Sequence, residues 1–335
     1  MNSSVSPFGA SVDATDVLTP EERFALRRVI VLANGKGGCG KTTLTVELAG
    51  ILAATGNLKV LIVDLDPQGN VGINLGYSAR GLGDEGAALL GAVLSDTPPA
   101  PLKNIRPNLD VLAGGDSTAD LADLILGRMR SGREGRGGVA KALARIAYQY
   151  DVIFIDTPPL YPGLLDEALL AARWAVVPTR PDEKDIQGLV KLDRQIGRVR
   201  PTNETLEILG VVLFGIPTVA AGKLSRVETT ARTDLAELLG EDIPIFDTTI
   251  RSVVTAAADS SSRGQLTAEL ARDSNDDEPW WKFLRGETTE RPIAKSATSL
   301  AEDHRSLAGE IFAELQDQEH QLATAAANPT GETHE

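Results

Sequence analysis

The sequence predicts an α/β domain whose mostly parallel β-sheet is doubly wound, with helices on both faces. Short apolar runs rich in β-branched residues recur along the chain, as expected of strands buried on both faces. Segments with apolar residues at helical spacing follow these runs, which indicates repeated strand–helix units. Glycines or carboxylates follow three of the runs, at the sheet edge where such domains bind ligands.

Composition limits the kinds of protein that this chain can be. Its 335 residues suffice for one large domain with additions, and a share of 42% hydrophobic but only 4% aromatic residues suits parallel strands. No stretch approaches transmembrane length and the N-terminus lacks a signal pattern, so we expect a cytoplasmic protein. The single cysteine, Cys39, excludes an internal disulfide framework. The net charge of −14 argues mildly against nucleic-acid binding but does not exclude a local basic face.

Residues 1–27 form a predicted arm ahead of the core. Residues 1 to about 19 are rich in Ser, Asp and Thr, so we expect disorder there. A short helix follows, with Thr19 as its N-cap, Pro20 at its first position, and Glu21 and Glu22 in its first turn. We expect this helix to pack against an edge of the sheet.

Residues 28–43 contain a complete phosphate-binding loop. An apolar strand over residues 29–32 leads into Gly35 to Thr42, which match G-x-x-x-x-G-K-[ST], and a helix starts near Lys41. Glycines let backbone N–H groups wrap a polyphosphate, and the helix N-terminus adds further donors. Lys41 is expected to reach the β- and γ-phosphates, and the Thr42 hydroxyl to take one Mg²⁺ position. The predicted nucleotide contacts are Gly35, Lys36, Gly37, Gly38, Cys39, Gly40, Lys41, Thr42 and Thr43.

Two further strands end in carboxylates. The run over residues 59–64 ends at Asp64 and continues through Leu65 to Asp66, at the edge where α/β sheets bind ligands. The alternative role for these two acids is capping of the next helix. The run over residues 150–156 ends at Asp156, as a Walker B strand does, and this carboxylate is expected to hold Mg²⁺ through water.

The remaining elements extend the same pattern. We expect strands over residues 109–112, 174–179 and 209–214, a loop over 128–138, and helices to about residue 200 and over 224–239. The core is predicted to span residues 28–266. An acidic insertion with Trp280 and Trp281 is expected over residues 267–298, where the tryptophans either anchor a partner or hold the insertion down. A closing helix over 299–315 and a disordered tail over 316–335 complete the chain.

Three of these motifs together resemble the ParA/MinD family of P-loop ATPases. Residues 36–43, KGGCGKTT, resemble the family's deviant Walker A motif, in which a second lysine follows the first glycine. Residues 60–70, VLIVDLDPQGN, resemble the second nucleotide motif, and residues 157–159, TPP, resemble the segment that senses the γ-phosphate. The resemblance covers about residues 28–266 and 299–315 and is nearest to ParA-type, Soj-like partition ATPases. Family members often have an asparagine near adenine after the strand at 209–214, and this chain has Phe214-Gly215-Ile216-Pro217 there.

The resemblance implies roles for individual residues. Lys36 would reach across a dimer interface to phosphates bound by the partner subunit, and Asp66 would position the attacking water. Asp64 would help to order the Mg²⁺ shell. The implied cofactors are ATP and Mg²⁺, with Lys36, Lys41 and Asp66 as catalytic residues and Thr42, Asp64 and Asp156 as metal ligands.

The resemblance also implies a partition function. An ATP-dependent sandwich homodimer would bind double-stranded DNA nonspecifically, and a DNA-bound ParB-type partner would stimulate slow hydrolysis to segregate chromosome or plasmid DNA. The protein would then be nucleoid-associated while it holds ATP. Lys223, Arg226 and Arg251 are the candidate DNA contacts, and ordinary surface charge is the alternative interpretation.

Other functions fit the same nucleotide-binding core less well. A positioning ATPase could act on a protein or membrane scaffold, but the tail from residue 316 lacks the basic amphipathic character that membrane binding needs. A metal-cluster carrier of the nitrogenase iron-protein type needs exposed cysteines, and only Cys39 is present. Asp64, Asp66 and Asp156 argue against a non-enzymatic adaptor.

Overall fold

A single β-sheet organises the chain. The computed structural model describes residues 18–130, 136–217, 225–240, 243–276, 285 and 296–327. Within this part the sheet has eight strands in the order β3-β4-β2-β5-β1-β6-β7-β8, parallel throughout except for β3. The strands are β1 (Val29–Leu32), β2 (Val60–Asp64), β3 (Leu102–Arg106), β4 (Leu109–Leu112), β5 (Val152–Asp156), β6 (Trp174–Thr179), β7 (Glu207–Ile216) and β8 (Ile250–Arg251).

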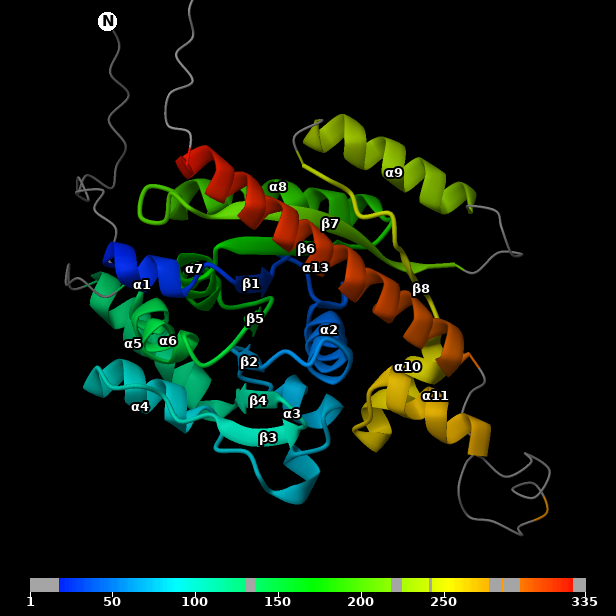
Figure 1. Cartoon of the computed structure of the whole chain (residues 1–335), viewed down its shortest axis with the longest axis horizontal. Coiled ribbons are helices and arrows are strands. Elements are labelled where there is room, and N and C mark those ends of the chain that lie inside the picture. The colour runs from blue at the N-terminus through cyan, green and yellow to red at the C-terminus, as the bar shows by residue number, and fades with distance from the viewer. Residues whose placement is uncertain are drawn as a thin grey trace, which may run out of the picture.

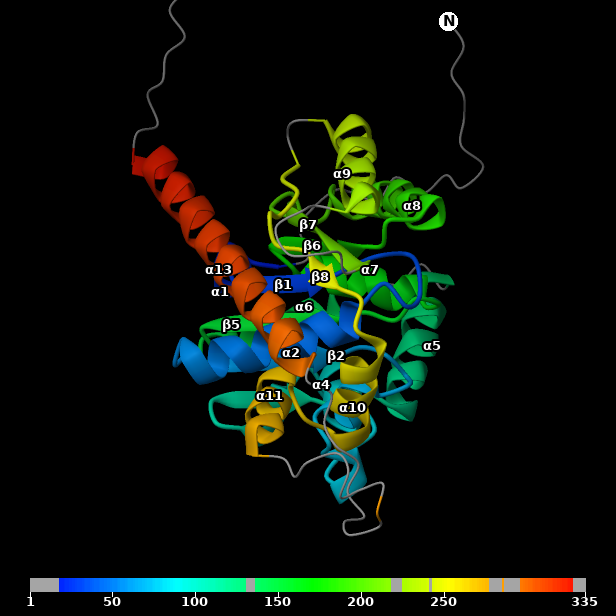
Figure 2. The ribbon, with the colours of Figure 1, turned by 90° about the vertical axis from the view of Figure 1, so that its right-hand side faces the viewer.

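Helices cover both faces of this sheet, as the sequence predicted (Figures 1 and 2). One face carries α4 (Ala87–Ser95), α5 (Asp116–Arg130), α6 (Gly138–Ala147), α7 (Pro162–Ala171), α8 (Glu183–Val199) and α9 (Arg226–Leu239). The other carries α2 (Lys41–Thr55), α3 (Asn70–Asn74), α10 (Val254–Arg263), α11 (Thr267–Asp276) and α13 (Ala297–Ala327). Two short helices, α1 (Pro20–Ala25) and the 3₁₀ turn η1 (Ser78–Arg80), complete the described set. The mostly parallel, doubly wound architecture is therefore confirmed.

Five of the six strands that the sequence predicted are wholly buried, and the sixth, predicted over residues 209–214, is the middle of β7, where residues 209–213 are buried. Every residue of β1, β2, β4, β5 and β6 is buried, so continuous apolar runs mark them. The edge strands β3 and β8 were not predicted. In β3 the side chains of Lys103 and Asn104 are exposed, and β8 has only two residues, so neither gives a continuous apolar signal.

The start of α1 follows its predicted capping. The Thr19 hydroxyl accepts a hydrogen bond from the Glu22 backbone N–H at 3.2 Å. The Glu22 carboxylate accepts one from the Thr19 backbone N–H at 2.9 Å. These reciprocal bonds form a capping box, with Pro20 at the first helical position. The stretch 1–17, predicted to be disordered, lies outside the described residues.

The C-terminal part differs from its prediction in two places. Residues 267–276, assigned to an insertion, form α11, which packs on the core through Leu270. The closing helix α13 continues to Ala327, so the first twelve residues of the predicted disordered tail are helical. Arg28, just before β1, donates two hydrogen bonds of 2.7 Å to Glu319 and ties this extension to the sheet. Trp280 and Trp281 lie outside the described residues.

A buried polar cluster joins α2 to α11 and α13. The Thr267 backbone N–H and hydroxyl each donate to the Glu47 carboxylate at 2.8 Å. His304 Nδ1 lies 3.0 Å from the Thr267 hydroxyl. All three side chains are buried, so this cluster fixes the two C-terminal helices on the helix that follows the phosphate loop.

Candidate nucleotide site

Three strand ends bring the predicted nucleotide residues together. The neighbours β2, β5 and β1 are parallel, with Asp64 opposite Asp156 and Asp156 opposite Leu32. The phosphate loop leaves β1 just after Leu32. The loop and both carboxylates therefore meet at one edge of the sheet, where parallel α/β sheets bind ligands.

Two glycines give the loop its shape. Gly38 and Gly40 have φ values of 76° and 97°, a region that is strained for residues with a side chain. A Cβ atom on Gly40 would also lie 2.6 Å from the ring of Phe214. Gly40 is the N-cap of α2 and offers no side chain to the first-turn N–H groups, so these donors face the loop uncapped.

Asn34 anchors the start of the loop, a role that was not predicted from the sequence. Its carboxamide oxygen accepts from the Lys36 backbone N–H at 3.0 Å, and its amide nitrogen donates to the Pro178 carbonyl at 2.8 Å. The loop is thereby tied to β6 as well as to β1. A lone asparagine after a strand is a common turn residue, so only the three-dimensional contact identifies it.

Lys41 is folded back into the loop. The side chain is buried, and its Nζ donates to the Lys36 carbonyl at 2.8 Å and lies 3.8 Å from Cys39 Sγ. The Lys41 ammonium thus lies inside the loop, whose backbone N–H groups would surround bound phosphates. Cys39 is buried beside it.

Thr42 and Asp156 form the centre of the site. The Thr42 hydroxyl donates to Asp156 Oδ2 at 2.7 Å. Asp156 Oδ1 is buried and has no hydrogen-bond partner among the described residues. Burial raises the pKa of Asp156 to about 7, although the Thr42 hydrogen bond and the charge of Lys41 oppose the rise. A buried carboxylate oxygen without a donor is costly, which points to a cation that is bound in the working state.

Asp64 and Asp66 are held by the turn that follows β2. Asp64 accepts from the backbone N–H groups of Asp66 at 2.9 Å and Val71 at 3.3 Å, so it partly caps α3. Burial, and then the charge of Asp156, raise the pKa of Asp64 well above its ordinary value. Asp66 accepts from the Gln68 N–H at 3.0 Å and caps no helix. Gly114 packs against them, where a Cβ atom would lie 2.6 Å from Asp64 Cγ.

These donors fit Mg²⁺. Thr42, Asp64 and Asp156 offer oxygen atoms only, the ligands that this hard cation prefers. Within the described ranges, no three His, Cys, Asp or Glu side chains are arranged to hold a metal ion by themselves. Mg²⁺ in nucleotide sites is usually held by one or two carboxylates together with phosphates, and when bound it would neutralise phosphate charge.

Comparison with known proteins identifies the family. A family model described as an AAA domain matches residues 27–208. The chromosome partitioning protein ParA of Caulobacter vibrioides is 36% identical over 189 residues, which cover 56% of this chain and 68% of that protein. The chain belongs to the ParA/MinD family of P-loop ATPases. It is accordingly an ATP-hydrolysing enzyme.

Solved structures share the fold of this ParA-family ATPase. An ATP complex of McdA from Cyanothece superposes with a TM-score of 0.66 at 20% identity, covering 85% of this chain and 96% of that one. Cobyrinic acid a,c-diamide synthase from Mycobacterium smegmatis, with an ATP analogue and magnesium, gives 0.57 at 24% identity, covering 80% and 99%. At such identities the likeness extends to the fold alone.

The family's second lysine is held within its own chain. Lys36 Nζ lies 3.0 and 3.2 Å from the two carboxylate oxygens of Asp182, which follows β6. The side chains are 34% and 46% exposed, so the pair lies at the surface. In this ParA-family chain Lys36 therefore points toward the loop after β6, and its predicted reach into a second subunit would need this pair to open.

The structure describes two of the three predicted DNA contacts. Arg226 is the exposed first residue of α9. Arg251 is partly buried and donates two hydrogen bonds to Asp303 on α13, at 2.6 and 2.7 Å. Lys223 lies outside the described residues. Because Asp303 neutralises Arg251, Arg226 is the stronger candidate of the two.

Proposed function

We propose that this chain is a ParA-type partition ATPase that binds ATP with Mg²⁺ and forms an ATP-dependent sandwich dimer. The observation that carries the proposal is the contact of Thr42 with Asp156, whose second oxygen is buried and unpartnered among the described residues. It stands beside Lys41 and the uncapped first turn of α2. The relation to ParA supports the partition role.

The residues divide the chemistry among them. Lys41 would exchange the Lys36 carbonyl for phosphate oxygens, and Thr42, Asp64 and Asp156 would hold Mg²⁺. Asp66 would orient the attacking water. Phosphoryl transfer depends on positioning and on charge stabilisation, so turnover should be slow until a second subunit and a ParB-type partner complete the site.

If Lys36 exchanged Asp182 for the phosphates bound by a second subunit, ATP binding would be coupled to dimerisation. A surface ion pair such as Lys36–Asp182 contributes about 1 kcal/mol or less. Phosphate oxygens of a second subunit carry more charge than one carboxylate and would compete for the ammonium. The dimer would then form only where nucleotide is bound, which gives a nucleotide-controlled switch.

The dimer would hold double-stranded DNA through phosphate contacts, with Arg226 and Lys223 as the first residues to examine. Such binding is nonspecific and depends strongly on salt. It would place the protein on the nucleoid while ATP is bound and return it to the cytoplasm after hydrolysis. The net charge of −14 requires these cations to be gathered on one face of the dimer.

The test is binding to random-sequence duplex DNA at physiological salt, first with ATP and Mg²⁺ and then with ADP. We expect binding with ATP only, and Arg226→Glu should weaken it at least several-fold. The matched control is Arg198→Glu, a charge reversal of an exposed arginine on α8, which should leave binding unchanged. Equal binding with ADP, or none with ATP, would refute the DNA part of the proposal.

The alternative is a positioning ATPase that acts on a protein or membrane scaffold. The chain's net negative charge favours it over DNA binding. None of the helices in the described ranges combines the length and apolarity that crossing a membrane requires. An ATP-dependent dimer that fails to bind DNA would be the outcome that favours this alternative.

A further inference from the structure

Asn34 is a buried polar residue at the start of the phosphate loop, just ahead of Gly35 and Lys36. Its exposed fraction is 1%, and both ends of its carboxamide have a partner. The oxygen accepts from the Lys36 backbone N–H at 3.0 Å, and the nitrogen donates to the Pro178 carbonyl at 2.8 Å. A short carboxamide offers an acceptor and a donor from one neutral group, which suits a buried position between two backbone segments. Asn34 therefore ties the peptide of Lys36 to the end of β6.

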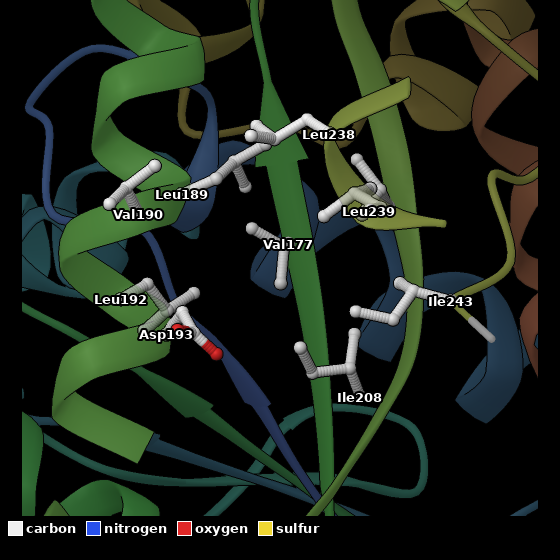
Figure 3. A pocket seen from close by; sticks show the side chains of 10 residues that line it. Val177, Leu189, Val190, Leu192, Asp193, Ile208, Leu238, Leu239 and Ile243 are labelled. Atoms are coloured by element: carbon white, nitrogen blue, oxygen red, sulfur yellow. The ribbon is translucent and has the colours of Figure 1, made fainter. Parts of the chain in front are cut away.

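Helix α8 also lies against Asn34. Gly188 of this helix has no side chain, and a Cβ atom there would lie 2.8 Å from the Asn34 carboxamide oxygen. The next residue of the helix, Leu189, lines the same pocket as Val177 of β6 (Figure 3). Both side chains are buried and belong to one core cluster. Packed elements thus fix the position of Asn34, so the start of the loop is held from the core.

The peptide of Lys36 is held on both of its sides. Its N–H donates to Asn34, and its carbonyl accepts from the Lys41 ammonium at 2.8 Å and from the Cys39 thiol at 3.3 Å. In the proposed function, Lys41 leaves this carbonyl for phosphate oxygens. A thiol is a weak donor, so the carbonyl side is then held less firmly. The hydrogen bond to Asn34 lies on the other side of the peptide and can persist when ATP is bound.

A fixed backbone lowers the cost of redirecting the Lys36 side chain. Lysine has a long flexible stem, so ordering its ammonium at a new partner already costs conformational entropy. A mobile peptide would add backbone freedom to that cost. Asn34 also joins the two segments that carry the surface ion pair, because Asp182 follows closely after Pro178. When this pair opens, Lys36 can turn to a second subunit from an unchanged backbone position.

We infer that Asn34 is a positioning residue for Lys36. It holds the Lys36 peptide in place while ATP draws Lys41 away from the same peptide, so that the Lys36 ammonium can reach phosphates bound by a second subunit. Both ends of its carboxamide contact backbone groups, so Asn34 acts through Lys36 rather than on the nucleotide. This role rests on the proposed functions of Lys36 and Lys41, whereas the hold on the peptide does not.

The first measurement is hydrogen exchange of the Lys36 amide in the full-length protein without nucleotide, followed by NMR with isotope-labelled lysine. Asn34→Ala should speed this exchange at least about tenfold, because the N–H loses its acceptor. The matched control is Asn203→Ala. Asn203 is also buried, and its carboxamide donates to the carbonyls of Leu169 and Ala172 at 2.9 and 2.8 Å. This variant should lose stability but leave the Lys36 exchange rate unchanged.

A second pair of variants moves Asn34 without removing it. Gly188→Ala puts a methyl group 2.8 Å from the carboxamide oxygen, so Asn34 must shift, whereas the higher helix propensity of alanine favours folding. Gly197→Ala on the same helix is the matched control, because its new Cβ atom has nothing within 4 Å. Gly188→Ala should speed the Lys36 exchange at least about threefold, and Gly197→Ala should leave it unchanged.

The second measurement is sedimentation with ATP and Mg²⁺, together with calorimetric titration of ATP. Asn34→Ala should weaken the ATP dimer at least about tenfold, while ATP affinity changes less than about threefold because Lys41 and Thr42 remain. Asn203→Ala should leave both constants unchanged at a temperature where it is folded. A merely structural role of Asn34 would not separate dimerisation from ATP affinity in this way.

Unchanged exchange of the Lys36 amide in Asn34→Ala would show that the carboxamide does not hold this peptide. A normal ATP dimer in Asn34→Ala, when Lys36→Ala abolishes it, would show that Lys36 does not need the hold. An equal loss of the dimer in Asn203→Ala would make the effect one of general stability. Each of these results would overturn the inference. If the wild type forms no ATP dimer, the proposed function fails, and the nucleotide-free exchange still decides whether Asn34 holds Lys36.

Discussion

Buried carboxylates lie at the first turn of α2 and at its middle, and their oxygen atoms are satisfied to different extents. At its N-terminus, Thr42 contacts Asp156, and one oxygen of that carboxylate lacks a partner among the described residues. Farther along, both oxygens of Glu47 accept hydrogen bonds from Thr267 of α11. His304 Nε2, behind Thr267, is also unpartnered among the described atoms, but a neutral acceptor costs less than a carboxylate oxygen. The first carboxylate keeps one oxygen without a donor among the described residues, whereas the second uses both oxygens to join α2 to α11.

A raised pKa alone would not separate these two roles. Burial raises the pKa of Asp156, Glu47 and also Glu167 to about 7. Glu167 accepts from the backbone N–H groups of Gly137 and Val139, at 2.7 and 3.0 Å, where α6 begins. Shifted pKa values indicate functional sites only in part, because structural carboxylates shift as well. Whether each carboxylate oxygen has a hydrogen-bond donor distinguishes a functional carboxylate from a structural one more clearly than its pKa does.

The largest effect should come from Lys41→Ala. Removal of the loop ammonium should weaken ATP affinity at least about a hundredfold, because charge-assisted contacts to phosphate are lost. Calorimetric titration with ATP and Mg²⁺ would measure it. The matched control is Lys141→Ala on α6, where the lysine is exposed. If Lys41→Ala kept normal affinity, the loop would not be the nucleotide site.

Asp66→Ala should separate binding from chemistry. The Asp66 carboxylate accepts a hydrogen bond from the Gln68 N–H within its own turn, so its loss should change ATP affinity by no more than about threefold. Turnover should fall about a hundredfold or more, because a group that positions the attacking water is lost. The variant should accumulate as an ATP-bound dimer, seen by light scattering. Phosphate release measured on Asp123→Ala provides the control. Normal turnover in Asp66→Ala would remove this residue from the mechanism.

The nucleotide edge could be predicted because its signals are local. The glycines, Lys41 and Thr42 lie within one short loop, and Asp64 and Asp156 each end an apolar run. Sheet order was needed to show that the two aspartates are opposite each other in register. The close approach of Gly114 to Asp64 could not be foreseen from a glycine pair after a strand.

The C-terminal half was harder to predict because its contacts join distant parts of the chain. Glu47 and Thr267 are 220 residues apart, and Arg28 and Glu319 are 291 apart. No local pattern indicates that residue 267 begins a packed helix or that the polar stretch after Leu315 is helical. Such helices are stabilised by tertiary contacts rather than by their own propensity.

The cluster at Glu47 predicts two opposing pH dependences. Burial raises the pKa of Glu47 from 4.5 to about 7 and lowers that of His304 from 6.5 to about 4. Between pH 4.5 and 7 the folded chain keeps a proton on Glu47 that the unfolded chain has lost, so stability falls as pH rises. Between pH 6.5 and 4 the unfolded chain takes up a proton that His304 refuses, so stability falls as pH drops.

Single substitutions should reveal each slope. Relative to the wild type, Glu47→Gln should remove the Glu47 part of the loss on the alkaline side, and His304→Gln should remove the His304 part of the loss on the acid side. The contributions of Asp156 and Glu167, whose pKa values are also raised to about 7, stay the same in both variants. Each removed part should amount to about 3 kcal/mol of unfolding free energy across its window. Urea denaturation from pH 4 to 7.5 would measure them. Parallel curves for the two variants would show that the cluster does not titrate as its burial requires.

The smallest effect should come from Asp182→Asn, which removes the carboxylate that pairs with Lys36 at the surface. The Lys36–Asp182 pair is partly exposed and screened, so releasing Lys36 should favour the ATP dimer by no more than about 1 kcal/mol, or about fivefold. Lys36→Ala should instead abolish that dimer while leaving most ATP binding intact. Sedimentation of both variants with ATP and Mg²⁺ would distinguish the two directions.

Whether Asp182→Asn tightens or weakens the dimer decides whether Lys36 changes its partner on dimerisation. If Asp182 only restrains Lys36 in the monomer, its neutralisation must tighten the dimer, and raising the salt concentration should erase the difference from wild type because screening weakens the pair equally. If dimerisation weakened instead, Asp182 would belong to the assembled interface. Lys36 would then keep its intrachain partner in the dimer and could not serve the phosphates of a second subunit.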